Sequence, residues 1–403
     1  MDYNKLYSET ANSMKASAIR ELLKIIAKPE IISFAGGLPD PNLFPEKEVA
    51  QAMQNVMQNT PREALQYGTT EGQTALKNQL VKLLKDSEDI DAATEEILVV
   101  SASQQGLDMT ARIFLDRGDA IITSSPTYLG ALQAFSAAGA DVFGAQSDEY
   151  GVIPSAIEAR LKELQEAGRV CKFIYLVPDF QNPNGLTIPE SRRLEILKLA
   201  EKYGTLIVED SPYRQVRFEG IAPKTFYKLD QGRGNVITLF TFSKVFVPGF
   251  RLGYVVAPKE VIQKYVILKQ AIDLCTSPML QLAAAEYLKS GHLFTHIQEV
   301  VKVYRQKRDL MLEMLEKYMP KEVTWTKPEG GLFLWVTLPE NINAQEMLKL
   351  SLQEHVAYVA GVDFYPARDA KYNDLRLNFS YSSPQQITEG IQRLATTIKK
   401  LLA

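Results

Sequence analysis

Lys244 and Arg251 are the two side chains whose positions in the sequence point most directly to chemistry. Both lie in residues 235–258, which read NVITLFTFSKVFVPGFRLGYVVAP. The runs 236–240 and 252–257 predict two strands, so both cations fall between strands. Desolvation lowers the pKa of a lysine, which would make Lys244 a nucleophile for a carbonyl group. Arg251 suits a phosphate, because its planar fork binds oxygens in pairs. Taken alone, the segment fits a surface loop with two solvated cations about as well.

Polar side chains follow several of the predicted strands, at the point where each strand ends. In chain order these are Ser103 and Gln104, Tyr128, Asn182, Asp210 and Tyr213, and Thr241 and Ser243. Each of them alone is more often a helix cap or a turn residue, because isolated motifs carry a high false-positive risk. Together with Lys244 they supply an amine, a phosphate cradle, a flat stacking surface and a carboxylate. Pyridoxal phosphate requires such a set: a lysine that forms a Schiff base, phosphate ligands and an acidic partner for the ring nitrogen.

Strands and helices alternate through the middle of the chain. Predicted strands cover residues 31–34, 96–100, 120–123, 142–143, 173–177, 206–208, 236–240, 252–257, 323–325, 332–336 and 375–379. Predicted helices cover residues 8–26, 46–58, 105–115, 129–138, 154–167, 189–203, 300–318 and 344–354, and another begins near residue 73. The alternation predicts an α/β fold with a mostly parallel sheet between two layers of helices. Ligands of such sheets bind beyond the carboxyl ends of the strands.

The composition argues against several other classes of function. A formal net charge of −3 without any block of Lys and Arg argues against nucleic-acid binding. His292 and His296 have a spacing that can suit a metal, but no HExxH pattern accompanies them, so a solvated helix face and no metal are expected. The sequence shows neither a signal peptide nor a long apolar run, and its two cysteines fit a reducing compartment. A cytoplasmic protein without a membrane partner is therefore expected.

The sequence resembles the class I/II aminotransferases, which are pyridoxal-phosphate enzymes of fold type I, along nearly its whole length. The motifs that carry the resemblance are SAIRELLK, ISFAGGLPDPNLFP, YGTTEGQTAL, SASQQGLD, PTYLGALQAF, QNPNG, VEDSPYR, TFSKVFVPGFRLGYV and LRLNFS, and their order matches the family. They look most like the branch that contains 2-aminoadipate and broad-specificity aromatic or branched-chain aminotransferases. The resemblance implies pyridoxal 5′-phosphate as the cofactor. It also implies ping-pong transamination between an L-amino acid (2-aminoadipate, glutamate, aromatic or branched-chain) and a 2-oxo acid such as 2-oxoglutarate.

The resemblance assigns the contacts of the cofactor. Lys244 would form the Schiff base and then move protons between the substrate Cα and the cofactor C4′. Asp210 would pair with the ring nitrogen, and Asn182 and Tyr213 would hydrogen-bond the ring oxygen O3′. The remaining contacts would be stacking by Tyr128 and phosphate binding by Ser103, Gln104, Thr241, Ser243 and Arg251. Tyr67 would reach the phosphate of the neighbouring subunit's cofactor, which implies a homodimer with shared active sites.

The resemblance also assigns the contacts of the substrate. Arg376 would bind the α-carboxylate, helped by Asn182 and by the turn at Gly36 and Gly37. On the residues alone, Arg376 belongs to the polar face of a strand, where an arginine is usually solvated. Arg20 would meet the distal carboxylate of an acidic substrate, and a solvated helix arginine is the alternative interpretation.

Three residues depart from the pattern of the family. Thr241 stands where a serine is commoner, which should preserve the hydroxyl. Asp179 replaces an asparagine and Asn184 replaces a threonine in PDFQNPNG. These last two departures leave the polarity of the substrate pocket open.

A large cofactor-binding domain is implied for residues 51–293, with a small domain made from residues 1–50 and 294–403. A C–S lyase or a decarboxylase on the same scaffold is the nearest alternative, because the same cofactor residues would serve it. A transcription regulator with an aminotransferase-like sensing domain is a more distant alternative. It would need a basic helix-turn-helix module ahead of that domain, whereas the resemblance begins within the first twenty residues.

Overall fold

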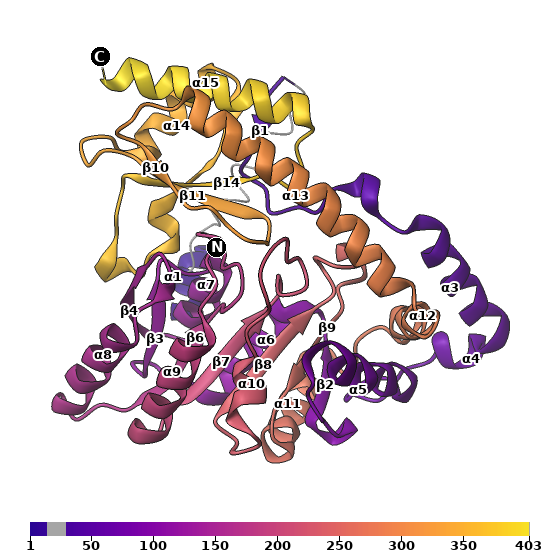
Figure 1. Ribbon diagram of the computed structural model, residues 1–403. Helices are drawn as coiled ribbons and strands as arrows, with labels where there is room; N and C mark the ends of the chain where they lie inside the picture. Colours follow the sequence, from indigo (N-terminus) through magenta and orange to yellow (C-terminus); the bar gives the residue numbers. More distant parts are fainter. Residues whose placement is uncertain (14–29, 403) are drawn as a thin grey trace.

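The computed structural model describes residues 1–13 and 30–402. Within them, eight strands form a large sheet in the order β2-β9-β8-β7-β6-β3-β4-β5 (Figure 1). These strands are β2 (Ile97–Val100), β3 (Ala120–Ser125), β4 (Asp141–Asp148), β5 (Gly151–Val152), β6 (Cys171–Leu176), β7 (Leu206–Ser211), β8 (Val236–Thr241) and β9 (Gly253–Val256). Neighbours from β8 to β4 pair in parallel, whereas β9 is antiparallel to both β2 and β8, and β5 is antiparallel to β4. The prediction of a mostly parallel sheet is confirmed.

Two layers of helices cover this sheet. One layer contains α8 (Pro154–Glu166), α9 (Glu190–Tyr203) and α10 (Phe226–Asp230), and the other contains α6 (Ala102–Phe114), α7 (Leu129–Ala137) and α11 (Lys259–Ile272). Successive side chains of a strand point to opposite faces of a sheet, so the apolar runs of the strands supply both layers. Ile174 and Ile207 pack in the core beneath α8 to α10. Their sequence neighbours Phe173 and Val208 pack in the core on the other face.

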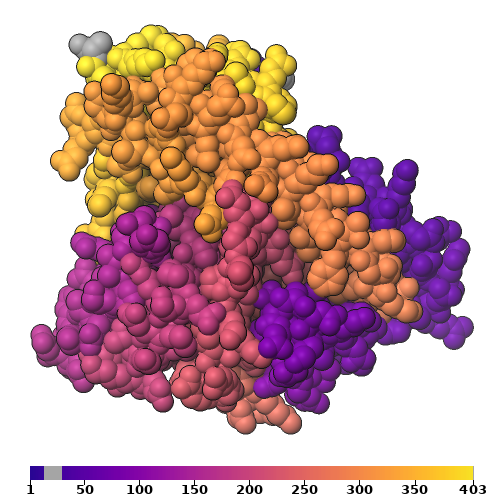
Figure 2. All heavy atoms as spheres, viewed as in Figure 1, coloured from indigo at the N-terminus to yellow at the C-terminus, as the bar shows by residue number. Residues whose placement is uncertain are grey.

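A smaller antiparallel sheet comes from the last part of the chain. Its order is β10 (Thr324–Trp325), β11 (Phe333–Thr337), β14 (Asp374–Asn378) and β13 (Val359–Ala360). Near the start of the chain, β1 (Ile32–Ser33) pairs in parallel with β12 (Val356–Ala357). The long helix α13 (His292–Tyr318) packs against α15 (Pro384–Leu402), which also contacts α14 (Ala344–Gln353). Figure 2 shows this C-terminal part of the chain, in orange and yellow, lying above the magenta segments of the large sheet.

The remaining elements are further helices and short 3-10 turns. They are the helices α1 (Glu9–Ser13), α3 (Glu46–Asn59), α4 (Pro61–Ala64), α5 (Thr74–Glu88) and α12 (Pro278–Lys289), and the single turns η1 (Tyr3–Lys5), η2 (Pro41–Leu43), η3 (Thr94–Glu96), η4 (Pro248–Phe250), η5 (Gly361–Phe364) and η6 (Ala367–Asp369). Helix α3 packs on α12, which in turn contacts α5 and α13.

Some predicted boundaries were wrong. Helix α6 begins at Ala102, α13 begins at His292, and β4 continues to Asp148, so each is longer than predicted. The predicted helix 8–26 overlaps α1, but its residues from 14 onwards lie outside the described part of the chain.

His296 corrects another prediction, because it is buried and does not lie on a solvated helix face. It falls on the apolar stripe of α13 between Leu293 and Val300. Burial lowers the pKa of His296, which favours the neutral imidazole.

Neither a metal site nor a membrane-spanning helix is found among the described residues. No group of three or more His, Cys, Asp or Glu side chains there is arranged to hold a metal ion. Among the helices of residues 1–13 and 30–402, none has the length and apolar character needed to cross a membrane.

Candidate active site

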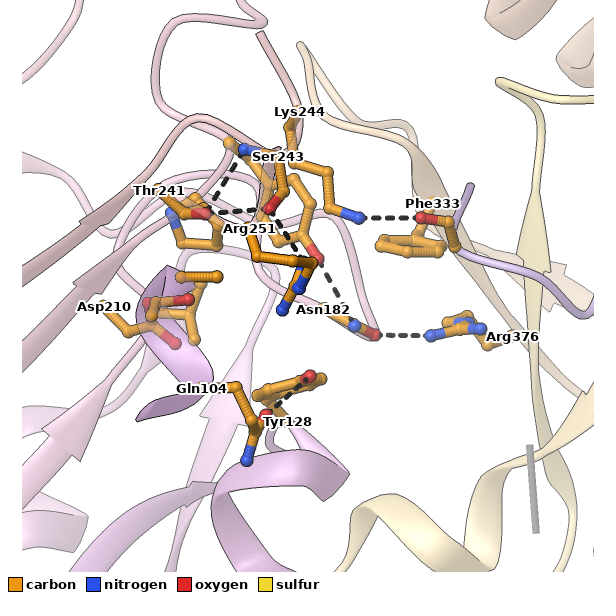
Figure 3. A pocket seen from close by; sticks show the side chains of 16 residues that line it. Gln104, Tyr128, Asn182, Asp210, Thr241, Ser243, Lys244, Arg251, Phe333 and Arg376 are labelled. Atoms are coloured by element: carbon orange, nitrogen blue, oxygen red, sulfur yellow. Dashed lines mark hydrogen bonds between the residues drawn. The ribbon is translucent and has the colours of Figure 1, made fainter. Parts of the chain in front are cut away.

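A pocket opens beyond the carboxyl ends of the parallel strands, as the sheet topology predicts. It brings together most of the predicted site residues: Gly37, Ser103, Gln104, Tyr128, Asn182, Asp210, Tyr213, Thr241, Ser243, Lys244, Arg251 and Arg376 (Figure 3). Gly36, Tyr67 and Arg20 are not among them. Tyr67 does not line the pocket of its own chain and is 79% exposed on the surface. Arg20 lies outside the described residues.

Lys244 projects into the pocket from the loop between β8 and β9. Its Nζ donates a hydrogen bond to the carbonyl oxygen of Gly37 at 2.8 Å. Burial lowers the pKa of Lys244 to about 8, and the positive charges of Arg376 and Arg251 act in the same direction. Near physiological pH the neutral form is therefore far more populated than in a lysine with the ordinary value of 10.5, and only the neutral amine can attack a carbonyl.

One end of the pocket is built for an anion. Ser243 Oγ lies 3.0 Å from Thr241 Oγ1 and 3.4 Å from Nη1 of Arg251. Opposite them is the first turn of α6, where Ser103 and Gln104 line the pocket. The first N–H groups of a helix have no partner within the helix and attract negative charge.

Gly253 makes this anion cradle possible. A Cβ on Gly253 would lie 2.6 Å from the carbonyl oxygen of Phe240 and 3.0 Å from the backbone of Ala102. A larger residue would therefore push the start of α6 away from β8 and β9.

Asp210 forms the opposite end of the pocket, at the end of β7. Its Oδ2 accepts a hydrogen bond from the hydroxyl of Tyr175 at 2.8 Å. Its Oδ1 is buried and has no hydrogen-bond partner among the described residues. Burial raises the pKa of Asp210 to about 7. An unpaired buried acceptor calls for a donor, and the protonated ring nitrogen of pyridoxal phosphate would supply one.

Tyr128 forms a wall of the pocket. Its hydroxyl donates to Gln104 Oε1 at 3.3 Å, and Gln104 Nε2 donates to the carbonyl oxygen of Gly130 at 3.1 Å (Figure 3). A Cβ on Gly130 would lie 2.6 Å from the ring of Tyr128, so the glycine leaves room for that ring. An aromatic ring held in this way suits stacking on a planar group.

Arg376 enters the pocket from β14 of the smaller sheet. Its Nη1 donates to Asn182 Oδ1 at 2.8 Å and its Nη2 donates to the carbonyl oxygen of Ala35 at 2.6 Å. The guanidinium carbon also lies 4.2 Å from the centre of the Phe333 ring. Burial lowers the pKa of Arg376 to about 10. No carboxylate of the described residues pairs with it, so the arginine suits a carboxylate from a ligand.

Phe333 and Tyr175 belong to the site and were missed in the sequence. Phe333 packs edge-on against Tyr213, with ring centres 5.7 Å apart, in addition to its contact with Arg376. In the sequence, Phe333 lies in a predicted strand, just after a pair of glycines and Leu332. That position was the one signal that could have pointed to it. Tyr175 lies in a buried strand, and its contact with Asp210 follows from the pairing of β6 with β7.

The departures at Asp179 and Asn184 do not change the polarity of the pocket, because neither residue lines it. The carboxylate of Asp179 is fully buried and pairs with three arginines instead. The distances are 2.9 Å to Arg193, 3.1 Å to Arg214 and 3.1 Å to Arg217.

One family and several known proteins are similar to this chain. The family described as "Aminotransferase class I and II" matches residues 30–394. Aromatic-amino-acid aminotransferase 1 of Thermococcus litoralis is 44% identical over 400 residues, which cover 99% of this chain and 95% of that protein. The structure of a kynurenine aminotransferase from Pyrococcus horikoshii, solved in complex with PMP, matches with a TM-score of 0.96 and 44% identity, covering 100% of this chain and 99% of the other. An α-aminoadipate aminotransferase from Thermus thermophilus, complexed with N-(5′-phosphopyridoxyl)-L-leucine, matches with a TM-score of 0.92 and 35% identity over the same shares.

Proposed function

Because this chain belongs to the family of class I and II aminotransferases, we propose that the pocket around Lys244 is where it transfers amino groups between amino acids and 2-oxo acids. The enzyme is a pyridoxal-phosphate-dependent aminotransferase. One observation carries the assignment of the site. The buried amine of Lys244, whose pKa is lowered, shares a pocket with the unpaired Oδ1 of Asp210 and with the buried guanidinium of Arg376.

The residues of this chain divide the work around the cofactor. Pyridoxal phosphate, when bound, supplies an aldehyde that an amine can capture and a ring that accepts electrons. Lys244 would hold the cofactor covalently. Once the substrate amine has replaced Lys244 on the cofactor, the freed amine of Lys244 would remove the proton from the substrate Cα and deliver it to C4′. Asp210, as a carboxylate, would accept the N–H of the ring nitrogen and keep that proton in place.

The other lining residues would bind and orient the cofactor. Its phosphate would lie between Arg251 and the first turn of α6, with the hydroxyls of Thr241 and Ser243 and with Ser103 and Gln104 as further donors. Tyr128 would stack on the ring. Asn182 and Tyr213, whose side chains lie 3.4 Å apart, would donate to the ring oxygen O3′.

Arg376 would bind the substrate α-carboxylate, and Asn182 and Gly37 would shape the same end of the pocket.

Three cations line the described pocket: Lys244, Arg251 and Arg376. With those three assigned to the amine, the phosphate and the α-carboxylate, none of the described lining residues offers a cation to a second carboxylate. The described pocket therefore fits donors with aromatic or branched-chain side chains, whereas 2-aminoadipate, glutamate and 2-oxoglutarate need one more cation. We propose Arg20 for that role.

The enzyme would act as a homodimer with shared active sites. Tyr67 and Leu65 are 79% and 72% exposed, which is unusual for side chains of their size and favours contact with a second copy of the chain. Tyr67 would then reach the cofactor phosphate of the partner.

Within each subunit, residues 51–293 would form the cofactor-binding domain, and residues 1–50 and 294–403 would form the smaller domain. Free cysteines at positions 171 and 275 support a cytoplasmic location.

Replacing Lys244 tests the assignment of the site. Lys244→Ala should still bind pyridoxal phosphate, through the phosphate and ring contacts, but should lose the absorbance of the covalent link. Turnover should fall by about three orders of magnitude or more, because covalent capture and proton transfer are lost together. Cofactor content, measured after denaturation, is the control for binding. Near wild-type turnover in a variant with normal cofactor content would refute the assignment.

A panel of amino donors tests the role of Arg20. Half-reactions followed by the cofactor absorbance would give kcat/KM for glutamate, 2-aminoadipate, leucine and phenylalanine. Arg20→Ala should weaken kcat/KM for the two acidic donors by about 1.5–3 kcal/mol, the worth of a charged hydrogen bond, and leave leucine and phenylalanine nearly unchanged. Equal losses for acidic and apolar donors would show that Arg20 does not recognise the side chain of the donor.

A further inference from the structure

Behind the anion end of the pocket, three side chains form a polar network that none of the roles above uses. Lys269 and Asp273 lie at the end of α11 and Gln105 lies in the first turn of α6. Nζ of Lys269 is 2.8 Å from both carboxylate oxygens of Asp273 and 3.1 Å from Gln105 Oε1. The side chain of Lys269 is fully buried. A buried ammonium is costly unless its partners hold it in a defined geometry, so this ion pair is a fixed point of the structure.

The ion pair determines which way the amide of Gln105 points. Nε2 of Gln105 donates to Asp273 Oδ2 at 2.8 Å, while Oε1 accepts from Lys269 and also from the backbone N–H of Ser101 at 2.7 Å. A lysine can only donate and a carboxylate can only accept, so the reversed amide would lose its bonds to both. The oxygen of Gln105 is thereby held towards Ser101.

Ser101 precedes the residue of this loop whose backbone is strained. Ala102 has φ +61°, a left-handed conformation that residues with a Cβ rarely adopt. Such a conformation persists only where the surrounding structure holds it. The hydrogen bond that Ser101 donates to Gln105 holds the turn on one side. On the other side, Gly253 has no Cβ and so leaves room for Ala102. The next two residues, Ser103 and Gln104, line the anion end of the pocket.

We propose that Gln105, Lys269 and Asp273 are positioning residues for the cofactor phosphate. The ion pair orients Gln105, and Gln105 holds the turn at Ser101 and Ala102 so that the first N–H groups of α6 face the phosphate. This inference rests on the proposed function, because it requires that the phosphate lies at the start of α6.

The test uses the purified apoenzyme and three ligands: pyridoxal phosphate, pyridoxal, which lacks the phosphate, and inorganic phosphate. Calorimetric titration gives the dissociation constant of each. The variants are Gln105→Ala, which leaves the ion pair intact, and Lys269→Met, which removes the group that orients Gln105. Arg112→Met is the matched control, because it removes an i,i+4 ion pair with Asp108 at 2.9 Å that lies exposed on the same helix.

Gln105→Ala and Lys269→Met should each bind pyridoxal phosphate and inorganic phosphate about 3- to 10-fold more weakly, the net effect of one hydrogen bond. Both should bind pyridoxal like the wild type, and Arg112→Met should bind all three ligands like the wild type. In the double variant the two losses should not add, because Lys269 acts through Gln105.

Two results would overturn the inference while leaving the proposed function in place. One is an unchanged affinity for pyridoxal phosphate in Gln105→Ala. The other is an equal loss for pyridoxal, which would mean that the network supports the pocket in general. If wild-type apoenzyme binds pyridoxal as tightly as pyridoxal phosphate, the phosphate site itself has been misplaced, and the proposed function fails with it.

Discussion

The reactivity of Lys244 comes from its surroundings more than from its type. Burial is the main cause that lowers its pKa to about 8, and the guanidinium groups of Arg376 and Arg251 contribute in the same direction. Those two cations also bind anions in the proposed mechanism. Once the anions are bound, their charges offset the cations, so the lysine experiences its strongest repulsion before cofactor and substrate arrive.

The pH dependence of amine capture tests this account of Lys244. An amine loses its proton as the pH rises through its pKa, so the rate at which apoenzyme captures pyridoxal should rise with a midpoint near pH 8 and level off above it. A lysine with the ordinary value of 10.5 would keep gaining reactivity well beyond that point. Stopped-flow absorbance measures the rate, and Lys244→Ala gives the background from surface lysines. A midpoint above pH 9.5 would contradict the desolvated amine.

At the scale of elements, buried ion pairs hold the loop after β6 in place. The carboxylate of Asp179 in this loop meets Arg193 from α9, and also Arg214 and Arg217. Their positive charges hold the pKa of Asp179 below its usual range despite full burial. The same loop carries Asn182, which contacts Arg376. The ion cluster therefore fixes a segment that reaches the active site.

Removing this carboxylate should be costly. Asp179→Ala leaves buried guanidinium groups without their partner, so the free energy of unfolding should fall by about 3–5 kcal/mol. Asp148→Ala is the matched control. Asp148 pairs with Arg192, the residue next to Arg193 in the sequence, and this ion pair is partly exposed to solvent. Such pairs contribute about 0–1 kcal/mol. Urea unfolding at one protein concentration measures both variants, and similar losses for the two would show that the buried cluster is not decisive.

The sequence predicted those parts of the site that depend on local pattern. Lys244, Asp210 and Asn182 each follow a recognisable strand, and parallel strands bring their carboxyl ends to one edge of the sheet. Contacts between distant segments could not be predicted in this way. Tyr175 reaches Asp210 only because β6 and β7 are neighbours. Long-range packing also explains why His296 is buried although its spacing suggested a solvated face.

For the whole molecule, mixing two damaged enzymes tests the shared active sites. Lys244→Ala and Tyr67→Phe subunits would form hybrid dimers after exchange. If Tyr67 serves the partner's site, one site of each hybrid carries both lesions and the other carries neither. Activity should then recover towards about half of the wild-type value per hybrid.

Native mass spectrometry would establish that subunits have exchanged, and each variant kept alone is the control. Absence of recovery, with exchange established and with a measurable defect in Tyr67→Phe, would show that Tyr67 does not act across subunits.

The pairing of the two chain ends governs when the enzyme can become active during its synthesis. Ile32 donates its backbone N–H to His355, and the backbone N–H of Asn378 bonds to Phe34. The arginine proposed for the substrate, Arg376, likewise reaches back to Ala35. A protein is synthesised from its N-terminus to its C-terminus. Residues 32–35 are therefore made first and must wait for partners that lie more than 300 residues later in the chain. The strands of the large sheet, which end at Val256, are complete well before that point. The growing polypeptide would thus possess its cofactor cradle before it gains the means to hold a substrate.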